Sequence, residues 1–107
     1  MKTATNTVAP DSTLEAAVRA AQLEAGSGEP WEYGFPAVMQ KLIDSGTVWS
    51  LEGSAGRAAM DALESGACFL PTTAARDYWG NRIPARGDLK PGTKGTLENS
   101  ARFYELT

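Results

Sequence analysis

The sequence predicts a mainly α-helical fold of three to four short helices, and three observations support this class. Apolar residues recur at the three- and four-residue spacing of amphipathic helices in several windows. Glycines follow these windows where helices would end, as at Gly26, Gly46 and Gly66. Most of the large apolar residues fall between residues 42 and 71, a stretch in which helical spacing dominates over strict alternation.

The length of 107 residues is that of one domain with a single modest core. We expect residues 1–10 to form a flexible terminus, residues 11–71 a helical body, and residues 72–107 a basic, loop-rich extension with a short terminal helix. Apolar residues make up 42% of the chain, and many of them are alanines. The helices should therefore pack closely, or bury one face against a partner.

The first helix is predicted over residues 13–25. Ser12 and Glu15 can form a capping box, in which each side chain accepts a hydrogen bond from the other residue's backbone N–H. Small apolar residues and Val18 then follow at helical spacing, and Gly26 supplies the end. Because its apolar stripe is mostly alanine, this helix must lie close to its neighbours.

The second and third helices are predicted over residues 36–45 and 54–65. Pro36 suits a first helical turn, where its missing N–H has no helical partner, and Gly66 ends the third helix. Residues 47–52 are compatible with a short strand or with a helical turn. We favour the short helix or turn, because both flanks are helical. The two helices would then form a helix-turn-helix-like pair.

The remaining third of the chain has weaker patterns. Residues 67–71 form an apolar segment that is compatible with a short strand. Residues 72–95 contain many glycines and prolines, with turn signals at Gly80-Asn81 and at Pro84, and predict an irregular segment. A last helix is predicted over residues 96–104, with Thr96 at its start.

Charge is unevenly distributed along the chain. Residues 1–71 hold four basic and nine acidic side chains, a balance of −5, whereas residues 72–107 hold six and four, a balance of +2. This asymmetry is compatible with an ordinary solvated surface. It is also compatible with an acidic body that carries a basic tail for docking elsewhere.

The composition argues against most catalytic schemes. The chain has no histidine, which removes the commonest general base and metal ligand. Its single cysteine, Cys68, lies in an apolar run and fits a small buried hydrophobic residue. The carboxylates show no spacing typical of acid–base catalysis or of a metal site. We therefore predict a non-enzymatic protein without catalytic residues, cofactor or metal.

The composition also bears on location. No apolar stretch approaches the roughly 20 residues of a membrane span. The first ten residues lack the apolar core of a signal peptide, and a lone cysteine fits a reducing compartment. We expect a cytoplasmic protein with no membrane partner.

Two aromatic clusters are candidate partner-binding sites. Trp31 and Tyr33 lie in a Pro- and Gly-rich segment, where they can cover the helices or anchor a partner. Tyr78 and Trp79 lie in the basic segment, where we favour packing onto the helical body together with Ile83. The alternatives are that they stack on nucleic acid or contact a protein.

Three arginines complete the set of candidate binding residues. Arg57 is placed in the first turn of the third helix, where a cation opposes the helix dipole and needs a partner. That partner is either a group of this chain, namely a backbone carbonyl, Glu52 or Asp61, or an external anion or binding partner beside the helix N-terminus. Arg82 and Arg86 follow the second aromatic cluster and either line its rim or contact a ligand.

The stretch from Leu42 to Gly66 resembles small proteins encoded by bacteriophages of actinobacteria, whose pattern combines W-x-L-x-G with x-x-G-R-x-A. The positions that match are Leu42, Ile43, Ser45, Gly46, Val48, Trp49, Leu51, Gly53, Gly56, Arg57 and Ala59. The tract from Asp77 to Arg86 is similar to one near the carboxyl terminus of such proteins. Ala55 departs from the pattern, which often has an aromatic residue there.

This resemblance implies a short phage accessory protein that binds a host protein or an antiviral-defence protein, as anti-CRISPR-like inhibitors do, in the host cell cytoplasm. An alternative is a nucleic-acid-binding accessory protein that uses residues 76–102. A further alternative is a virion or assembly component. Self-association into a homo-oligomer is compatible with each of them.

Overall fold

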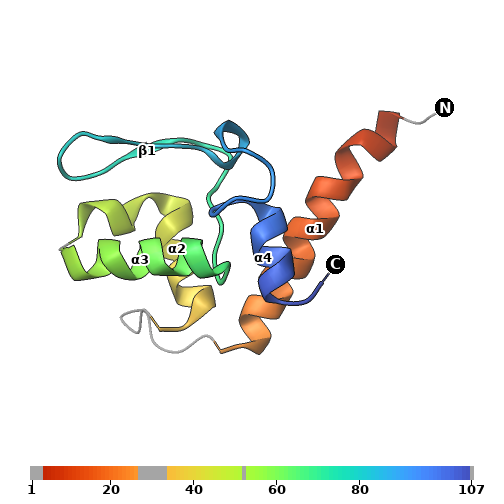
Figure 1. Ribbon diagram of the computed structural model, residues 1–107, viewed down its shortest axis with the longest axis horizontal. Helices are drawn as coiled ribbons and strands as arrows, with labels where there is room; N and C mark the ends of the chain where they lie inside the picture. Colours follow the sequence, from red (N-terminus) through yellow and green to blue (C-terminus); the bar gives the residue numbers. More distant parts are fainter. Residues whose placement is uncertain (1–3, 27–33, 52, 107) are drawn as a thin grey trace.

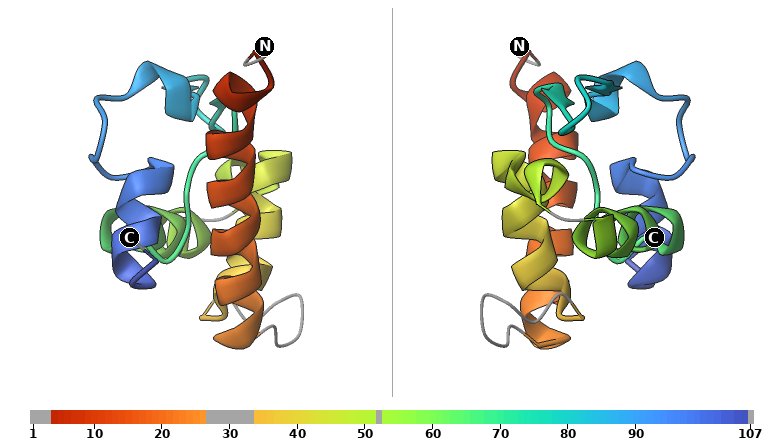
Figure 2. Two further views of the ribbon diagram at one scale, coloured as in Figure 1. Left: turned by 90° about the vertical axis from the view of Figure 1, so that its right-hand side faces the viewer. Right: turned by 90° about the vertical axis from the view of Figure 1, so that its left-hand side faces the viewer.

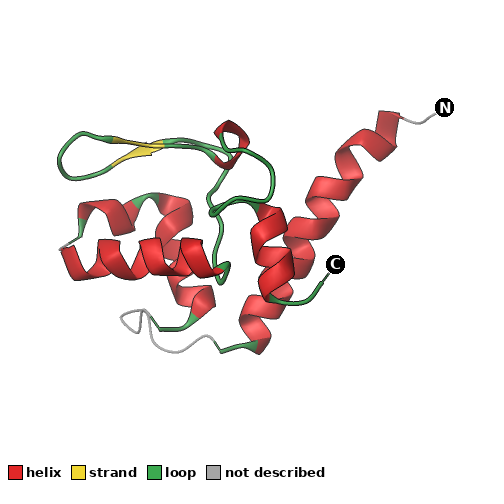
Figure 3. Cartoon of the chain, viewed as in Figure 1, coloured by secondary structure: helices red, strands yellow, loops and turns green. Residues whose placement is uncertain are grey.

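The computed structural model describes residues 4–26, 34–51 and 53–106. It is mainly helical, with a short two-stranded sheet, as the sequence predicts (Figures 1 and 3). Its elements in chain order are α1 (Ala4–Glu24), α2 (Pro36–Ser45), η1 (Thr47–Ser50), α3 (Gly53–Ser65), β1 (Ala75–Arg76), β2 (Arg82–Ile83), η2 (Arg86–Asp88) and α4 (Leu97–Phe103).

Helix α1 begins at Ala4, earlier than the predicted start at residue 13. Ser12 therefore lies inside the helix and does not cap it, and residues 4–10, for which the sequence predicts a flexible terminus, are helical. The prediction relied on the capping box of Ser12 and Glu15, whereas the helix continues through Pro10, which cannot donate the helical hydrogen bond to the carbonyl of Asn6. A helix that is already formed can extend past one missing bond, because adding a residue costs far less than starting a new helix.

The predicted bounds of α2 and α3 are confirmed to within a residue. Pro36 occupies the first turn of α2, and Gly46 ends the helix with a φ of 78°, a conformation that glycine adopts without strain. Residues 47–50 form the short 3-10 helix η1, so the helical interpretation of this segment is confirmed for them. The α2–η1–α3 unit is the predicted helix-turn-helix-like pair.

The carboxyl-terminal part is more ordered than the sequence predicts. Strands β1 and β2 pair antiparallel, with Ala75 opposite Ile83 and Arg76 opposite Arg82, and form a hairpin that lies alongside η1 and α3 (Figure 3). Glycine and proline signals mark the turn of this hairpin, but two-residue strands are too short to show alternation. The predicted last helix is confirmed as α4, and the Thr96 side chain accepts a hydrogen bond from the backbone N–H of Asn99.

Two apolar clusters form the core. The larger one joins α2, η1 and α3, and its buried members are Met39, Ile43, Val48, Trp49, Ala55, Ala59, Leu63, Cys68 and Leu70. The smaller one lies between α1 and α4, which run side by side in Figure 2, and it contains Val18, Phe69 and Leu97 with Leu14 and Tyr104 at its edge.

The segment 67–71 connects the two clusters. Cys68 and Leu70 belong to the larger cluster, and Phe69 belongs to the smaller one. Successive side chains of an extended backbone point in opposite directions, so one short segment supplies both clusters. The alternative of a strand is not realised, because the backbone groups of this segment have scattered partners: Cys68 and Leu70 donate to the carbonyls of Ala62 and Gly95, and Phe69 pairs with a side chain.

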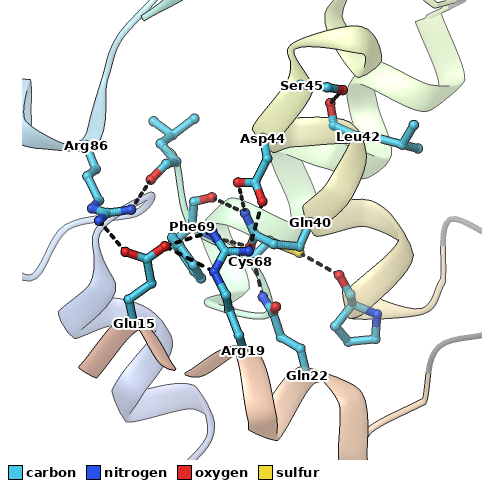
Figure 4. Close-up of polar contacts among 12 residues, drawn as sticks. Glu15, Arg19, Gln22, Gln40, Leu42, Asp44, Ser45, Cys68, Phe69 and Arg86 are labelled. Atoms are coloured by element: carbon cyan, nitrogen blue, oxygen red, sulfur yellow. Dashed lines mark hydrogen bonds and ion pairs between the residues drawn. The ribbon is translucent and has the colours of Figure 1, made fainter. Parts of the chain in front are cut away.

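Gln40 takes the role of the missing strand (Figure 4). Its side-chain oxygen accepts a hydrogen bond from the backbone N–H of Phe69 at 3.0 Å, and its nitrogen donates to the Phe69 carbonyl at 2.9 Å. The same amide also bonds to Gln22 and Asp44. All four hydrogen-bonding positions of this buried amide are therefore used, which offsets the cost of burying it.

The aromatic ring of Phe69 lies close to two guanidinium groups, which come from Arg19 and Arg86 (Figure 4). Their central carbons lie 5.0 Å and 5.5 Å from the ring centroid. The Glu15 carboxylate bridges both arginines at 2.8 Å, and Arg19 also pairs with Asp44 at 2.9 Å. Burial raises the pKa of Glu15, but the hydrogen bonds from the two arginines outweigh this effect and lower it below its usual value.

We call Glu15, Arg19, Phe69 and Arg86 the Phe69 clamp. It joins α1, the segment 67–71 and η2, which are distant in the sequence. The clamp fixes where the hairpin leaves the helical body.

Candidate docking groove

A five-residue turn, Asp77–Asn81, forms the tip of the hairpin. One carboxylate oxygen of Asp77 accepts hydrogen bonds from the backbone N–H groups of Trp79 at 2.9 Å and Asn81 at 2.8 Å. These bonds lower the pKa of Asp77, although partial desolvation acts in the opposite direction. Gly80 has a φ of 86°, which favours glycine at that position. The tip is therefore a defined turn with its polar groups paired.

The tip presents two aromatic side chains to solvent. Tyr78 is 72% exposed and Trp79 is 80% exposed, so the favoured prediction that they pack onto the helical body is wrong. The prediction holds for Ile83, since the five-residue turn carries the two rings beyond the strands. The rings touch edge to face, with centroids 5.0 Å apart and an angle of 88° between their planes. This is a favoured aromatic geometry, so each ring restricts the other's orientation.

The tip is also fixed to the helical body. The backbone N–H of Tyr78 donates to the carbonyl of Trp49 in η1 at 2.9 Å. Ala75 and Ile83, one from each strand, pack against the larger apolar cluster. The backbone that carries the two exposed rings is therefore fixed against the helical body.

An open groove of about 680 Å³ lies between this hairpin and α3. One wall is the hairpin, which contributes Asp77, Tyr78, Trp79 and Ile83. The floor comes from η1 and the residue after it, which contribute Val48, Trp49, Ser50 and Leu51. The other wall is one face of α3, which contributes Gly53, Gly56, Arg57, Met60 and Asp61.

The residues of α3 that line the groove lie on a different face of the helix from its buried residues. Ala55, Ala59 and Leu63 are buried on the side of the core, and positions 53, 56, 57, 60 and 61 repeat at helical spacing on the groove side. Gly56 has open space where a side chain would lie. The groove is therefore shallow at its centre, with Met60 beside that space.

Three charged side chains line the groove. Asp77 is used by the turn, whereas Arg57 and Asp61 lie one helical turn apart on α3. Among the residues that the structure describes, neither Arg57 nor Asp61 forms an ion pair or a side-chain hydrogen bond; Glu52, a partner considered for Arg57, lies outside the described residues. The groove thus offers one positive and one negative group to a ligand.

The structure brings together three of the seven residues predicted to bind a partner: Arg57, Tyr78 and Trp79 all line the groove. Arg82 lies outside it and pairs with Asp88 at 2.9 Å. The side chain of Arg86 is only 10% exposed, because it belongs to the Phe69 clamp. The remaining two, Trp31 and Tyr33, lie outside the described residues.

Two groove residues are missed by the sequence analysis, because Leu51 and Met60 are large and apolar and are expected in the core on that ground. This expectation is wrong, since the structure leaves Leu51 37% exposed and Met60 39% exposed. The alanines of α3 already fill the space toward α2, so Met60 falls on the opposite face. Its spacing of three from Arg57 and four from Gly56 is a signal that could have placed it there.

Most basic side chains of the carboxyl-terminal part bond within the chain. Arg76 donates to the Gly80 carbonyl, Lys94 pairs with Glu64, and Arg102 donates to the Gly92 carbonyl. With Arg82 and Arg86 also engaged, five of the six basic side chains after residue 71 have a partner within the chain. A nucleic-acid phosphate would have to compete with these bonds.

Reactive chemistry is limited in the described part of the chain. Burial raises the pKa of the Cys68 thiol to about 12, so it stays protonated at neutral pH and is a poor nucleophile. Within residues 4–26, 34–51 and 53–106, no cluster of three or more cysteine, aspartate or glutamate side chains is placed to hold a metal ion. Likewise, no described helix combines the length and apolar character needed to cross a membrane.

In comparisons with known proteins, no family model, curated protein or solved structure matches this chain. The groove and the tip are therefore interpreted from their own chemistry.

Proposed function

We propose that this chain is a non-enzymatic binding protein that docks on another protein through a docking surface made of Tyr78, Trp79, Leu51, Met60 and Arg57. One observation carries the proposal: two aromatic rings that are each about three-quarters exposed stand on a hydrogen-bonded turn beside an apolar groove. Tyrosine, tryptophan and arginine are the residues that dominate the energetics of protein interfaces.

The fixed geometry of the tip supports the same proposal. A side chain that is immobilised on binding costs about 0.5–1.5 kcal/mol in lost freedom. The edge-to-face contact between Tyr78 and Trp79, and the turn bonds of Asp77, restrict these rings before binding. A partner therefore meets a surface whose ordering cost is already small.

The resemblance to phage accessory proteins suggests which partner this is. We propose a protein of the bacterial host or of its antiviral defence, met in the host cytoplasm and inhibited or modulated by occlusion of its surface. The acidic balance of residues 1–71 supports a protein partner over a nucleic-acid partner, because it repels phosphates.

Affinity capture from an actinobacterial host lysate tests the proposal. The wild-type chain should retain one stoichiometric host protein, and the double variant Tyr78→Ala/Trp79→Ala should lose it. Leu23→Ala is the matched control, because Leu23 is an exposed apolar residue on α1 that does not line the groove. The proposal fails if no stoichiometric protein is retained, or if the double variant retains it as well as the wild type.

The nucleic-acid alternative can be tested with the same variants. The exposed rings could stack on bases, and such binding would weaken steeply as salt is raised. We expect no mobility shift of single- or double-stranded DNA at low salt, because the basic side chains are bonded within the chain. A salt-dependent shift that the double variant abolishes would overturn this expectation.

A further inference from the structure

The charges of α3 make the groove complementary to itself. Arg57 and Asp61 are opposite in sign, lie one turn apart on the same face and have no ionic partner among the described residues. Consider two copies of α3 that pack antiparallel through their groove faces, with a two-fold axis that crosses the helix at the level of residue 59. Position 57 of each copy then faces position 61 of the other. Two equivalent Arg57–Asp61 pairs then form across the interface, as a two-fold contact requires.

The shape of this face permits such an approach. Gly56 lies on the groove side of α3, and a side chain there would meet nothing within 4 Å, whereas at Gly53 it would meet the Arg57 guanidinium at 3.2 Å. Two helices can therefore come close at this point, with the two Met60 side chains filling the space between them. No like charges are brought together on the α3 face, since its remaining groove positions are uncharged.

The exposed rings add apolar area around the helix pair. Tyrosine and tryptophan each bury roughly 150–250 Å² when covered. Two such rings from each copy would contribute on the order of 600 Å², about half of the roughly 1,200 Å² at which stable interfaces begin. The two α3 faces and Leu51 are available for the remainder.

We propose that the free protein forms a two-fold symmetric dimer in which the groove of each copy is covered by α3 of the other. This goes beyond the proposed function and does not depend on it: a dimer can form whether or not a host target exists. If both hold, the target and the second copy compete for one surface, and binding of the target separates the dimer.

Sedimentation velocity of the full-length chain over a concentration series tests this assembly. We expect a species of twice the monomer mass whose dissociation constant rises with salt, because two ion pairs cross the interface. Arg57→Asp or Asp61→Arg alone places like charges opposite each other and should raise the dissociation constant at least about tenfold. The swapped double variant Arg57→Asp/Asp61→Arg restores complementarity and should return it to within about threefold of the wild type.

Two further variants give the matched comparisons. Lys41→Glu reverses an exposed charge on α2 outside the groove and should leave dimerisation unchanged, while Trp79→Ala should weaken it at least about tenfold. The circular dichroism spectrum of each variant checks that α3 still folds. A chain that stays monomeric at all concentrations overturns the proposal. So does a dimer that tolerates both single charge reversals, or one that the double swap fails to restore.

The outcome also separates this inference from the proposed function. A monomer that captures a host protein through Trp79 leaves the function standing and removes the dimer. A dimer that follows the charge-swap pattern but captures no host protein does the reverse.

Discussion

The Phe69 clamp and the hairpin tip use the same kinds of residue, aromatic rings with arginines nearby, in opposite ways. In the clamp, one ring contacts two guanidinium groups, and one carboxylate pairs with both of them. At the tip, two rings stand in solvent beside an arginine that has no ionic partner among the described residues. The charges of the first arrangement are paired within the chain, whereas the rings and the arginine of the second remain open to the partner that we propose.

This contrast separates two arginines that the sequence predicts alike as binding residues. Arg86 pairs with Glu15 at 2.8 Å, whereas Arg57 forms no ion pair with a described residue. Residue type alone therefore does not tell a paired arginine from one that is open to a ligand.

The largest effect on stability is expected for Phe69→Ala, which removes the ring at the centre of the Phe69 clamp. Removing a buried phenylalanine costs about 3–5 kcal/mol in the free energy of unfolding, and both arginines of the clamp would lose their ring contact. Urea unfolding followed by circular dichroism measures the loss. Phe103→Ala, which truncates a half-exposed phenylalanine on α4, should cost much less; equal losses would contradict the role given to the clamp.

The next largest effect is expected for Gln40→Leu. This change removes both hydrogen bonds to the backbone of Phe69, and each buried group left unpaired costs about 1–3 kcal/mol. We therefore expect a loss of about 2–4 kcal/mol in the free energy of unfolding. Lys41→Leu introduces the same side chain at the neighbouring exposed position and should be nearly neutral. A Gln40→Leu variant as stable as the wild type would show that the amide does not replace a strand.

A smaller effect is expected when the pH dependence of stability is altered at Glu15. The folded-state pKa of Glu15 lies below its usual value of 4.5, so its contribution is present above that pH and is lost as the pH falls through the folded-state pKa. Glu15→Gln should lower the free energy of unfolding by about 1 kcal/mol at pH 7, and the difference from wild type should shrink as the pH falls below 4.5. Urea unfolding at a series of pH values measures this, with Glu24→Gln as an exposed control. A constant difference at every pH would exclude ionisation of Glu15 as its source.

The smallest effect on stability is expected for Trp79→Ala. Because the ring is 80% exposed, its truncation should change the free energy of unfolding by less than about 0.5 kcal/mol. The same change should cost at least about 2 kcal/mol in partner binding. Thermal unfolding measures the change in stability, and the capture experiment measures the change in partner binding. A strongly destabilised variant would assign this ring to the fold and remove it from the docking surface.

Local signals were sufficient to predict much of the fold. Pro36 and Gly46 bound α2, and Thr96 caps α4; each acts on residues within one turn of itself, so its effect can be read along the sequence. The hairpin was not predicted, because its pairing involves only two residues in each strand. Its position depends on a bond from Tyr78 to Trp49, which is distant in the chain.

The candidate site could be predicted only in part. Aromatic residues in a turn-rich segment are candidates for binding, but the sequence does not show that Tyr78 and Trp79 are exposed, because burial depends on how the hairpin lies on the helical body. Met60 could not be distinguished from a core residue by hydrophobicity alone. The partner of Arg86 is Glu15, 71 positions earlier in the sequence, and no local pattern connects them.

The division of the segment 67–71 between the two apolar clusters has a consequence for how the molecule unfolds. A local opening that withdraws Cys68 and Leu70 from one cluster also pulls on Phe69 in the other, since these residues are covalent neighbours. The two halves should therefore melt in a single cooperative step, with tryptophan fluorescence and circular dichroism giving the same midpoint. The amide proton of Phe69 should exchange with deuterium only through that global event, which makes it a natural reporter of total stability.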